Sequence, residues 1–498
     1  MPPATTESAY DASLLGTREG VCRVAADDPE LPALLRTGVP IVITGAALVS
    51  AEVRHRWASA SYLTEQLGDE QQGRAYGIYE ATAGVEVPRY AYHDFSDRCT
   101  SGQYVVPAPP KGPTRACTGS FRDFMDLRRE KGDHFYLQTT IVTSPKAHEE
   151  LEAEAERNKP KARGVTKSAA TGKRVASSGG TALVDGRPEV SKLAGAIRRD
   201  LLTFNWAWLR HVTAHRPQGR PYGQSQLFVG GLSGVTPLHF DTYDNMLAQV
   251  AGTKRVLLVS PDQFERCYPF PTHHPQDRQS RLGALAAVDE RRFPKWRGVR
   301  TLEAELLAGD VLHLPPYWWH QVQMMRPLEA STSSDTASRL NVSLNFWFMA
   351  SPWEADSPAP VLPPDDLGYI SPEMADALQR AWPKEVSLAP HQLVGLGRDI
   401  EATIATNLGP ASVGQLLRKA MPEAGATEES WAPTLEEHEA PSIRSMNLAL
   451  FSRGFSPPAA VEFLRALYRG RFEGLEQSNT RSAARGKAPD WWQPAGMS

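Results

Sequence analysis

Short runs of alternating apolar and polar residues dominate the chain up to about residue 350, and helical spacing replaces them further on. Alternation with a period of two is typical of half-buried β-strands, and spacing of three to four residues is typical of amphipathic helices. The alternating runs predict a buried strand at 38–44, a strand at 135–142 and a group of strands over roughly 222–350. A helix is predicted at 52–67. The pattern therefore predicts a mainly β protein with flanking helices.

Two helices are predicted in the segment 389–421, where apolar residues recur every three or four positions. The first ends at Gly409-Pro410, and the second begins at Ser412, a suitable N-cap. Their apolar positions are Leu393, Leu396, Ile400, Ile404 and Leu408, followed by Val413, Leu416, Leu417 and Met421. This face packs either within the same chain or against a second copy. A further helix is predicted near Pro458–Tyr468.

The segment from Ser144 to Pro188 differs in character from its neighbours. It opens with acidic and alanine-rich sequence and continues with lysine and arginine among serine, glycine and alanine. We find no apolar period there, so the segment is predicted to be a disordered insertion that cannot offset its ordering entropy. Its basic half is either a solvated loop or a nuclear-import or nucleic-acid contact.

Composition narrows the class of protein without identifying it. The net charge of −3 gives no electrostatic reason to expect nucleic-acid binding as the main activity. The four cysteines have no CxxC pair, which favours a reducing compartment. The sequence shows no secretory signal and no apolar run of about 18 residues. We therefore expect a protein of the cytoplasm, the nucleus or both, without a membrane partner.

The motif Thr236-Pro-Leu-His239-Phe-Asp241 is followed about eighty residues later by Tyr317-Trp-Trp-His320. A histidine and a carboxylate two residues apart, with a distant second histidine, form the ligand set of the 2-His-1-carboxylate triad. Residues i and i+2 of a strand point to the same face, so His239 and Asp241 can reach one metal ion. His320 would come from a second strand folded back across the first. The sequence therefore predicts an Fe(II) site with open coordination positions.

Lys254 follows Gly252 at the head of an apolar, β-branched strand. It is either solvated at a sheet edge or directed into the barrel, where an ammonium would bind a small dicarboxylate.

These motifs resemble those of the JmjC (cupin-like) hydroxylases between Phe135 and about Met421. Within that family the similarity is greatest to the asparaginyl hydroxylases that modify hypoxia-inducible factor and ankyrin-repeat proteins. The matching segments are Val235–Asp241, Ser260–Ser280, Gly309–His320, Asn345–Trp347 and the helical segment from Pro390 to Leu417. The resemblance implies a double-stranded β-helix (jelly-roll) core, a C-terminal dimerisation segment, and Fe(II), 2-oxoglutarate and O2 as cofactor and co-substrates.

The resemblance also implies a role for individual residues. The iron ligands would be His239, Asp241 and His320. The far carboxylate of 2-oxoglutarate would be bound by Lys254, Thr236 and Tyr136, with Asn245 and Asn345 near its chelating end. The substrate would be bound by Arg278, Gln279, Tyr92, Gln138 and Trp347. Alternative roles stay open for Tyr136 and Trp347 as core packing, Arg278 as an ion-pair partner and Thr236 as a turn cap.

On this basis the chain divides into seven parts. They are a flexible N-terminus (1–30), the N-terminal part of the catalytic domain (31–143), the insertion (144–188), the JmjC β-helix core (189–350), a linker (351–388), dimerisation helices (389–421) and a partly disordered C-terminal extension (422–498).

The function expected from the resemblance is asparaginyl β-hydroxylation of ankyrin-repeat or transcription-factor substrates by a homodimer. Two alternatives are a JmjC histone-lysine demethylase or RNA-base hydroxylase, and a non-catalytic cupin scaffold.

Overall fold

The computed structural model describes residues 18–67, 76–81, 114–142, 145–158, 183–184, 187–188, 197–214, 225–272, 276–282, 285, 288–325, 340–348, 390–408, 412–419, 442, 446, 450 and 457–471. Tyr92, the basic half of the insertion and the linker 351–388 lie outside the described residues.

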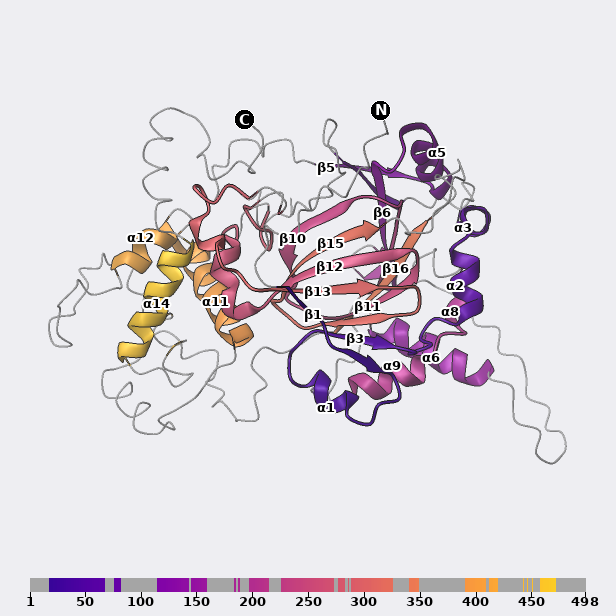
Figure 1. The fold of residues 1–498 in the computed structure, drawn as a ribbon, viewed down its shortest axis with the longest axis horizontal. Helices are drawn as coiled ribbons and strands as arrows, with labels where there is room; N and C mark the ends of the chain where they lie inside the picture. Colours follow the sequence, from indigo (N-terminus) through magenta and orange to yellow (C-terminus); the bar gives the residue numbers. More distant parts are fainter. Residues whose placement is uncertain are drawn as a thin grey trace, which may run out of the picture.

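Two facing β-sheets form the centre of the molecule (Figure 1). The smaller sheet has the order β1-β13-β12-β15-β10. Its strands are β1 (Arg18–Gly20), β13 (Thr301–Leu306), β12 (Thr253–Val259), β15 (Trp319–Met325) and β10 (Val235–Phe240). Apart from the parallel pair β1–β13, neighbouring strands in this sheet are antiparallel.

The larger sheet has the order β2-β3-β14-β11-β16-β9-β6-β4-β5. Its strands are β2 (Arg23–Ala25), β3 (Ile41–Thr44), β14 (Val311–Leu314), β11 (Asp244–Ala251), β16 (Asn341–Phe348), β9 (Ser225–Gly230), β6 (Phe135–Val142), β4 (Tyr76–Ala81) and β5 (Thr114–Gly119). Successive strands from β9 to β16 pass repeatedly between the two sheets. The predicted jelly-roll core is thereby confirmed.

The space between the sheets is filled at one end by inward-facing aliphatic side chains. Alternation along each strand places every second residue there, as with Val256 and Leu258 of β12. The neighbouring strand β13 contributes Ala304 and Leu306, and the opposing sheet contributes Leu247, Leu312 and Leu314. This packing fixes the register of the strands that carry the functional residues, since a slip by one residue would turn each inward side chain outward.

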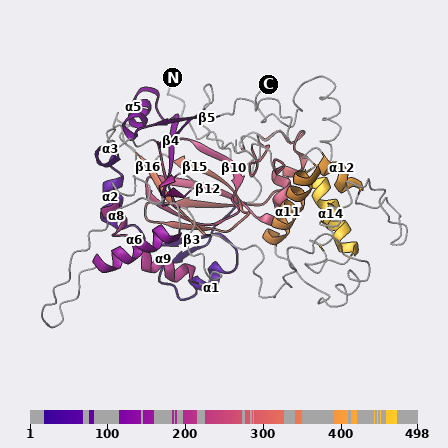
Figure 2. The same cartoon turned by 180° about the vertical axis from the view of Figure 1, so that it is seen from behind.

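Helices cover the outer face of the larger sheet (Figure 2). They are α1 (Leu31–Leu35), α2 (Ala51–Trp57), α3 (Ala60–Leu67), α5 (Phe121–Lys131), α6 (Pro145–Asn158), α8 (Arg198–Leu201) and α9 (Trp206–Thr213). The single helix predicted at 52–67 is two helices, α2 and α3. Ala58 and Ser59 separate them, and the side chain of Ser59 accepts a hydrogen bond from the backbone N–H of Tyr62.

Two stretches predicted to be irregular contain regular structure. Helix α6 occupies the start of the segment 144–188, and its residues Ala147, Leu151 and Ala155 are buried in the main core. Their four-residue spacing is helical, and the prediction missed it because two of the three positions are alanines. Strands β1 and β2 lie within the stretch 1–30, where pairing with β13 and β3 provides the order that the local sequence does not predict.

The C-terminal helices lie at the opposite end of the sheets from α2 and α3 (Figures 1 and 2). They are α11 (Pro390–Leu408), α12 (Ser412–Lys419) and α14 (Pro457–Arg471). Leu416 and Leu417 are 1% and 0% exposed and pack in one cluster with Leu464 and Leu467 of α14. Of the two alternatives for these leucines, the structure shows the intramolecular one.

Within the described part of the chain, none of the helices has both the length and the apolar character that crossing a membrane requires.

Candidate metal and 2-oxoglutarate site

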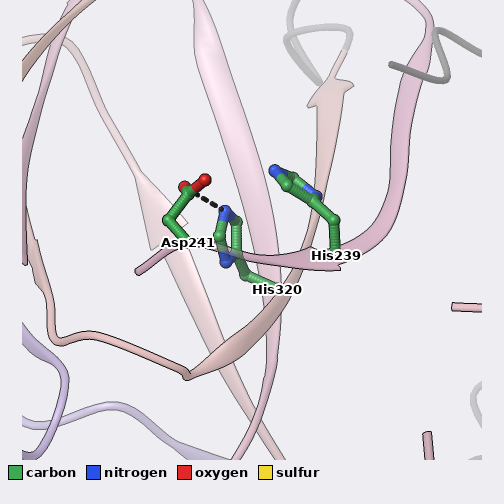
Figure 3. A group of neighbouring side chains, drawn as sticks. All are labelled: His239, Asp241 and His320. Atoms are coloured by element: carbon green, nitrogen blue, oxygen red, sulfur yellow. Dashed lines mark ion pairs between the residues drawn. The ribbon is translucent and has the colours of Figure 1, made fainter. Parts of the chain in front are cut away.

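The three predicted metal ligands converge at one point (Figure 3). His239 of β10 lies directly opposite His320 of β15 in the antiparallel register, and Asp241 follows the last residue of β10. The two imidazole centroids are 4.0 Å apart, and Nε2 of His320 lies 3.5 Å from Oδ2 of Asp241. One ligand atom from each residue falls within 4.8 Å of the others. This spacing suits three ligands around one metal ion.

A shift in strand register helps to shape the site. The pairing of β10 with β15 is irregular between Thr236 and His239, which are three residues apart. In a regular strand, residues three apart point to opposite faces. The register shift allows the Thr236 and His239 positions to share the inner face, opposite Val322 and His320 of β15. Such irregularities often direct side chains towards functional sites.

Both histidines are held in the form that binds metal. Nδ1 of His239 lies 2.8 Å from the carbonyl oxygen of Pro237, and Nδ1 of His320 lies 3.0 Å from that of Trp318. In each case Nδ1–H donates to the carbonyl, which leaves the lone pair of Nε2 for a metal. Burial lowers the pKa of both rings, and burial together with the neighbouring His320 lowers the pKa of His239 to about 3. The neutral imidazoles and one carboxylate therefore fit an Fe(II) ion.

The loop at 276–282 runs beside β10 and brings two of the predicted substrate residues to the metal ligands. Gln279 forms an isolated antiparallel bridge with His239 and is 5% exposed. Nη1 of Arg278 lies 3.5 Å from Oδ1 of Asp241. The ion-pair alternative considered for Arg278 is thus present in the structure.

Lys254 is directed into the space between the sheets and is 2% exposed. Its ammonium donates a hydrogen bond to the hydroxyl of Ser343 and lies 5.7 Å from the ring centroid of Phe228. Burial lowers its pKa to about 7. Among the described residues, no carboxylate forms an ion pair with this ammonium. A buried cation without a counter-ion fits the binding of an anionic ligand, here the far carboxylate of 2-oxoglutarate.

Two amides line the same interior space. Asn345 of β16 lies opposite Leu247 of β11, whose side chain belongs to the interior cluster, and Asn245 precedes Leu247 by two residues. The Oδ1 atoms of both asparagines are buried and have no hydrogen-bond partner within the described residues. Buried amide oxygens usually have a partner, so a ligand or water between the sheets would satisfy them.

The other predicted residues lie along the same barrel. Tyr136 is 8% exposed and stacks on Phe228 with centroids 5.9 Å apart. The side-chain amide of Gln138 donates to that of Gln226 at 3.0 Å. Trp347 is half-buried and contacts Tyr243 edge to face.

Sequence reasoning missed Ser343 and Phe228, the two contacts of the Lys254 ammonium. Ser343 precedes Asn345 by two residues on the same strand and therefore shares its face. The two-residue spacing from Asn345 could therefore have identified Ser343 as a residue of the site. No local pattern points to Phe228, whose contact with Lys254 depends on the approach of β9 to β12 across the barrel.

The fold and the site together define a jelly-roll protein with a candidate 2-His-1-carboxylate centre. Residues 30–354 match the sequence model of the cupin-like domain family, and this chain belongs to that family. JmjC cupin proteins generally use Fe(II) and 2-oxoglutarate, which agrees with the ligand set and with Lys254.

Shorter stretches are similar to curated JmjC-containing and related proteins. HSPB1-associated protein 1 of Bos taurus is 36% identical over 119 residues, which are 23% of this chain and 24% of that protein. Jumonji C domain-containing protein 5 of Drosophila melanogaster is 33% identical over 121 residues, 24% of this chain and 26% of that protein. Lysine-specific demethylase JMJ30 of Arabidopsis thaliana is 30% identical over 119 residues, 24% of each chain. The alignments thus span about a quarter of each relative.

Proposed function

We propose that this protein is an Fe(II)- and 2-oxoglutarate-dependent protein hydroxylase that acts on the β-carbon of asparagine in ankyrin-repeat or transcription-factor substrates. Membership of the cupin-like family and the convergence of His239, Asp241 and His320 support the oxygenase class. Lys254, buried without a described counter-ion, supports the choice of 2-oxoglutarate as co-substrate.

The residues of the chain would bind and orient the reactants. Bound iron and 2-oxoglutarate supply oxidative chemistry: O2 is consumed, one oxygen atom enters a C–H bond, and succinate and CO2 are released. Lys254 would neutralise the far carboxylate of 2-oxoglutarate, with hydroxyl groups from Thr236 and Tyr136 as further donors. Asn245 and Asn345 would hydrogen-bond groups near the metal-chelating end. The aliphatic end of the barrel would limit the access of water to the bound co-substrate.

The position of Gln279 is the single observation that carries the asparagine assignment. Its backbone is bridged to that of His239, and paired residues of an antiparallel bridge direct their side chains to the same side. A primary amide offers both a donor and an acceptor, which complement those of an asparagine side chain. We propose that Arg278 assists this recognition, while Gln138, Trp347 and Tyr92 line the path of the substrate polypeptide. Such contacts would hold one C–H bond facing the metal.

The test is incubation of the full chain with Fe(II), 2-oxoglutarate and a consensus ankyrin-repeat protein, followed by peptide mass spectrometry. The expected product is an asparagine that carries one added oxygen, with succinate formed in proportion. Gln279→Leu, which keeps the approximate side-chain volume but removes the amide, should lower product formation more than it lowers 2-oxoglutarate binding. Absence of any oxidised asparagine in the wild-type reaction would contradict the proposal.

A lysine demethylase is the second candidate. The similarity to JMJ30, which is named a lysine-specific demethylase, favours it. The pair of Tyr243 and Trp347 also favours it, because Tyr243 is 43% exposed, lies two residues after Asp241 and contacts Trp347 at a centroid distance of 6.2 Å. Aromatic faces bind methylated ammonium groups. Methyl-lysine peptides in the same assay would release formaldehyde if this candidate is correct, and the ankyrin-repeat protein would stay unmodified.

A homodimer through 389–421 stays a prediction. Because Leu416 and Leu417 are covered within the chain, a dimer would have to use other side chains of this segment. Light scattering on the full chain would give about twice the single-chain mass of 54.7 kDa if the dimer forms.

A further inference from the structure

A two-pronged ion pair joins the C-terminal helix α11 to the loop beside the metal ligands. The guanidinium of Arg398 donates to both carboxylate oxygens of Asp277, each at 2.8 Å. Both side chains are largely buried, with 12% and 20% of their surface exposed. This parallel geometry is specific to arginine, since the ammonium of a lysine cannot form it.

Arg398 also contacts β10, which carries His239 and ends just before Asp241. Its guanidinium lies 5.1 Å from the ring centroid of Phe240. Phe240 is the residue between His239 and Asp241, and it is fully buried against Phe264 and Trp319. Arg398 therefore contacts both the loop, through Asp277, and strand β10, through Phe240.

The loop transmits this contact to Asp241. A carboxylate oxygen of Asp277 accepts the backbone N–H of Arg278 at 2.7 Å, and the carbonyl of Arg278 accepts the N–H of Phe240 at 2.9 Å. Arg278 has a φ of +68°, a conformation that residues with a β-carbon rarely adopt. Hydrogen bonds on both sides hold the backbone in this conformation. Its side chain then reaches Oδ1 of Asp241.

We propose that Arg398 is a positioning residue for the metal site, acting through Asp277 and Arg278 on the carboxylate of Asp241. With Oδ1 directed to Arg278, Oδ2 is left beside His320, in the position of a metal ligand. Helix α11 would thus help to position a metal ligand without contacting the metal itself. The inference rests on the proposed metal site.

The test measures metal binding instead of turnover. The metal-free full chain is titrated with Co(II), whose visible absorption reports both affinity and ligand geometry. The principal variant is Arg398→Gln combined with Asp277→Asn, which removes both charges of this ion pair together. We expect Co(II) affinity to fall about tenfold or more, the usual effect of removing groups that orient metal ligands, with an altered spectrum. Arg398→Lys keeps the charge without the two-pronged geometry. Its Co(II) affinity should lie between those of the double variant and the wild type.

The matched control is Arg255→Gln combined with Glu303→Gln. This pair is also two-pronged, at 2.7 and 2.8 Å, and joins β12 to β13 on the side away from the barrel interior. Its removal should leave Co(II) affinity within about twofold of the wild type.

A folded double variant that binds Co(II) with wild-type affinity and spectrum would overturn the proposal. If thermal unfolding shows that the double variant does not fold, Arg398→Lys decides, and an unchanged affinity in that variant is equally contradictory. Failure of the wild-type chain to bind Co(II) at all would instead remove the proposed function.

Discussion

Two buried cations in this molecule have opposite surroundings. Arg398, which contacts Phe240 of β10, is paired with Asp277 through two hydrogen bonds. Burial alone would lower the pKa of Arg398, but Asp277, with smaller contributions from Glu401 and Tyr317, outweighs burial and raises the pKa. Lys254, between the sheets, has a hydroxyl and an aromatic ring as neighbours, and burial lowers its pKa to about 7.

The difference separates a structural charge from a ligand-binding charge. A cation whose counter-ion belongs to the same chain is satisfied in the folded protein and stabilises a fixed geometry. A cation buried without such a counter-ion destabilises the ligand-free protein and is compensated when an anion binds. Perturbed pKa values gather at functional sites for this reason. The same residue class thus has two roles, and the location of the counter-ion distinguishes them.

The largest expected effect is on stability. Arg398→Met leaves the buried carboxylate of Asp277 without its partner and should lower the free energy of unfolding by about 3–5 kcal/mol. Lys254→Met leaves no described carboxylate unpaired and should be neutral or stabilising in the ligand-free protein. Urea unfolding of the metal-free chain at pH 6 compares the two variants. Equal losses of stability in both variants would contradict the distinction between a structural cation at Arg398 and a ligand-binding cation at Lys254.

Lys254→Met should instead act on 2-oxoglutarate. A hydrogen bond to a charged group contributes about 1.5–3 kcal/mol, so we expect affinity for 2-oxoglutarate to fall about 10- to 100-fold. Calorimetry on the Co(II)-loaded protein measures this directly. Lys254→Arg serves as the charge-conserving control and should retain more of the affinity than Lys254→Met. An unchanged affinity in Lys254→Met would show that the ammonium does not bind the co-substrate.

The pKa of Lys254 predicts a dependence on pH. The folded pKa of about 7 lies below the ordinary value of 10.5, so the ammonium form that binds an anion is lost as the pH rises through 7. Affinity for 2-oxoglutarate should fall about tenfold between pH 6 and pH 8, with proton uptake on binding at the higher pH. Lys254→Arg should show no such fall, since its guanidinium stays charged.

The same shift predicts that stability of the ligand-free protein changes with pH. The unfolded chain binds the proton of Lys254 more tightly than the folded chain does. The contribution of this group to stability therefore rises as the pH increases from about 7 to 10.5. Comparison of wild type with Lys254→Met over this range isolates the effect, and parallel curves would contradict the assigned pKa.

The smallest expected effect belongs to Thr236. If its hydroxyl donates to the far carboxylate, Thr236→Val should weaken 2-oxoglutarate binding about two- to tenfold, the value of one hydrogen bond. If Thr236 is only a turn cap, the variant should lose stability and keep its affinity. Calorimetry and thermal unfolding of the same sample separate these outcomes.

Local patterns were sufficient to predict a mainly β protein with flanking helices, because alternation along each strand reflects burial on one face. The jelly-roll core was expected only from the resemblance of the motifs to the JmjC hydroxylases. The Thr236–His239 register shift was not predictable in this way, since pairing with β15 and not local sequence determines it. The pairing of Arg398 with Asp277 was also missed. It joins residues 121 apart in sequence, and nothing near either residue indicates a partner.

The prediction of disorder over 144–188 was wrong for α6 for a different reason. The face formed by Ala147, Leu151 and Ala155 is too small to stabilise an isolated helix, and it becomes stable only by packing on the main core.

We propose that His239, Asp241 and His320 hold Fe(II) while Lys254 binds the far carboxylate of 2-oxoglutarate. Anaerobic titration of the iron-loaded chain with 2-oxoglutarate, followed by visible charge-transfer absorption, tests it most directly. We predict a saturable band in the wild type, no band in His320→Ala, and a band in Lys254→Met that requires about 10- to 100-fold more 2-oxoglutarate. A wild-type chain that binds no Fe(II), or binds it without any response to 2-oxoglutarate, would contradict the account.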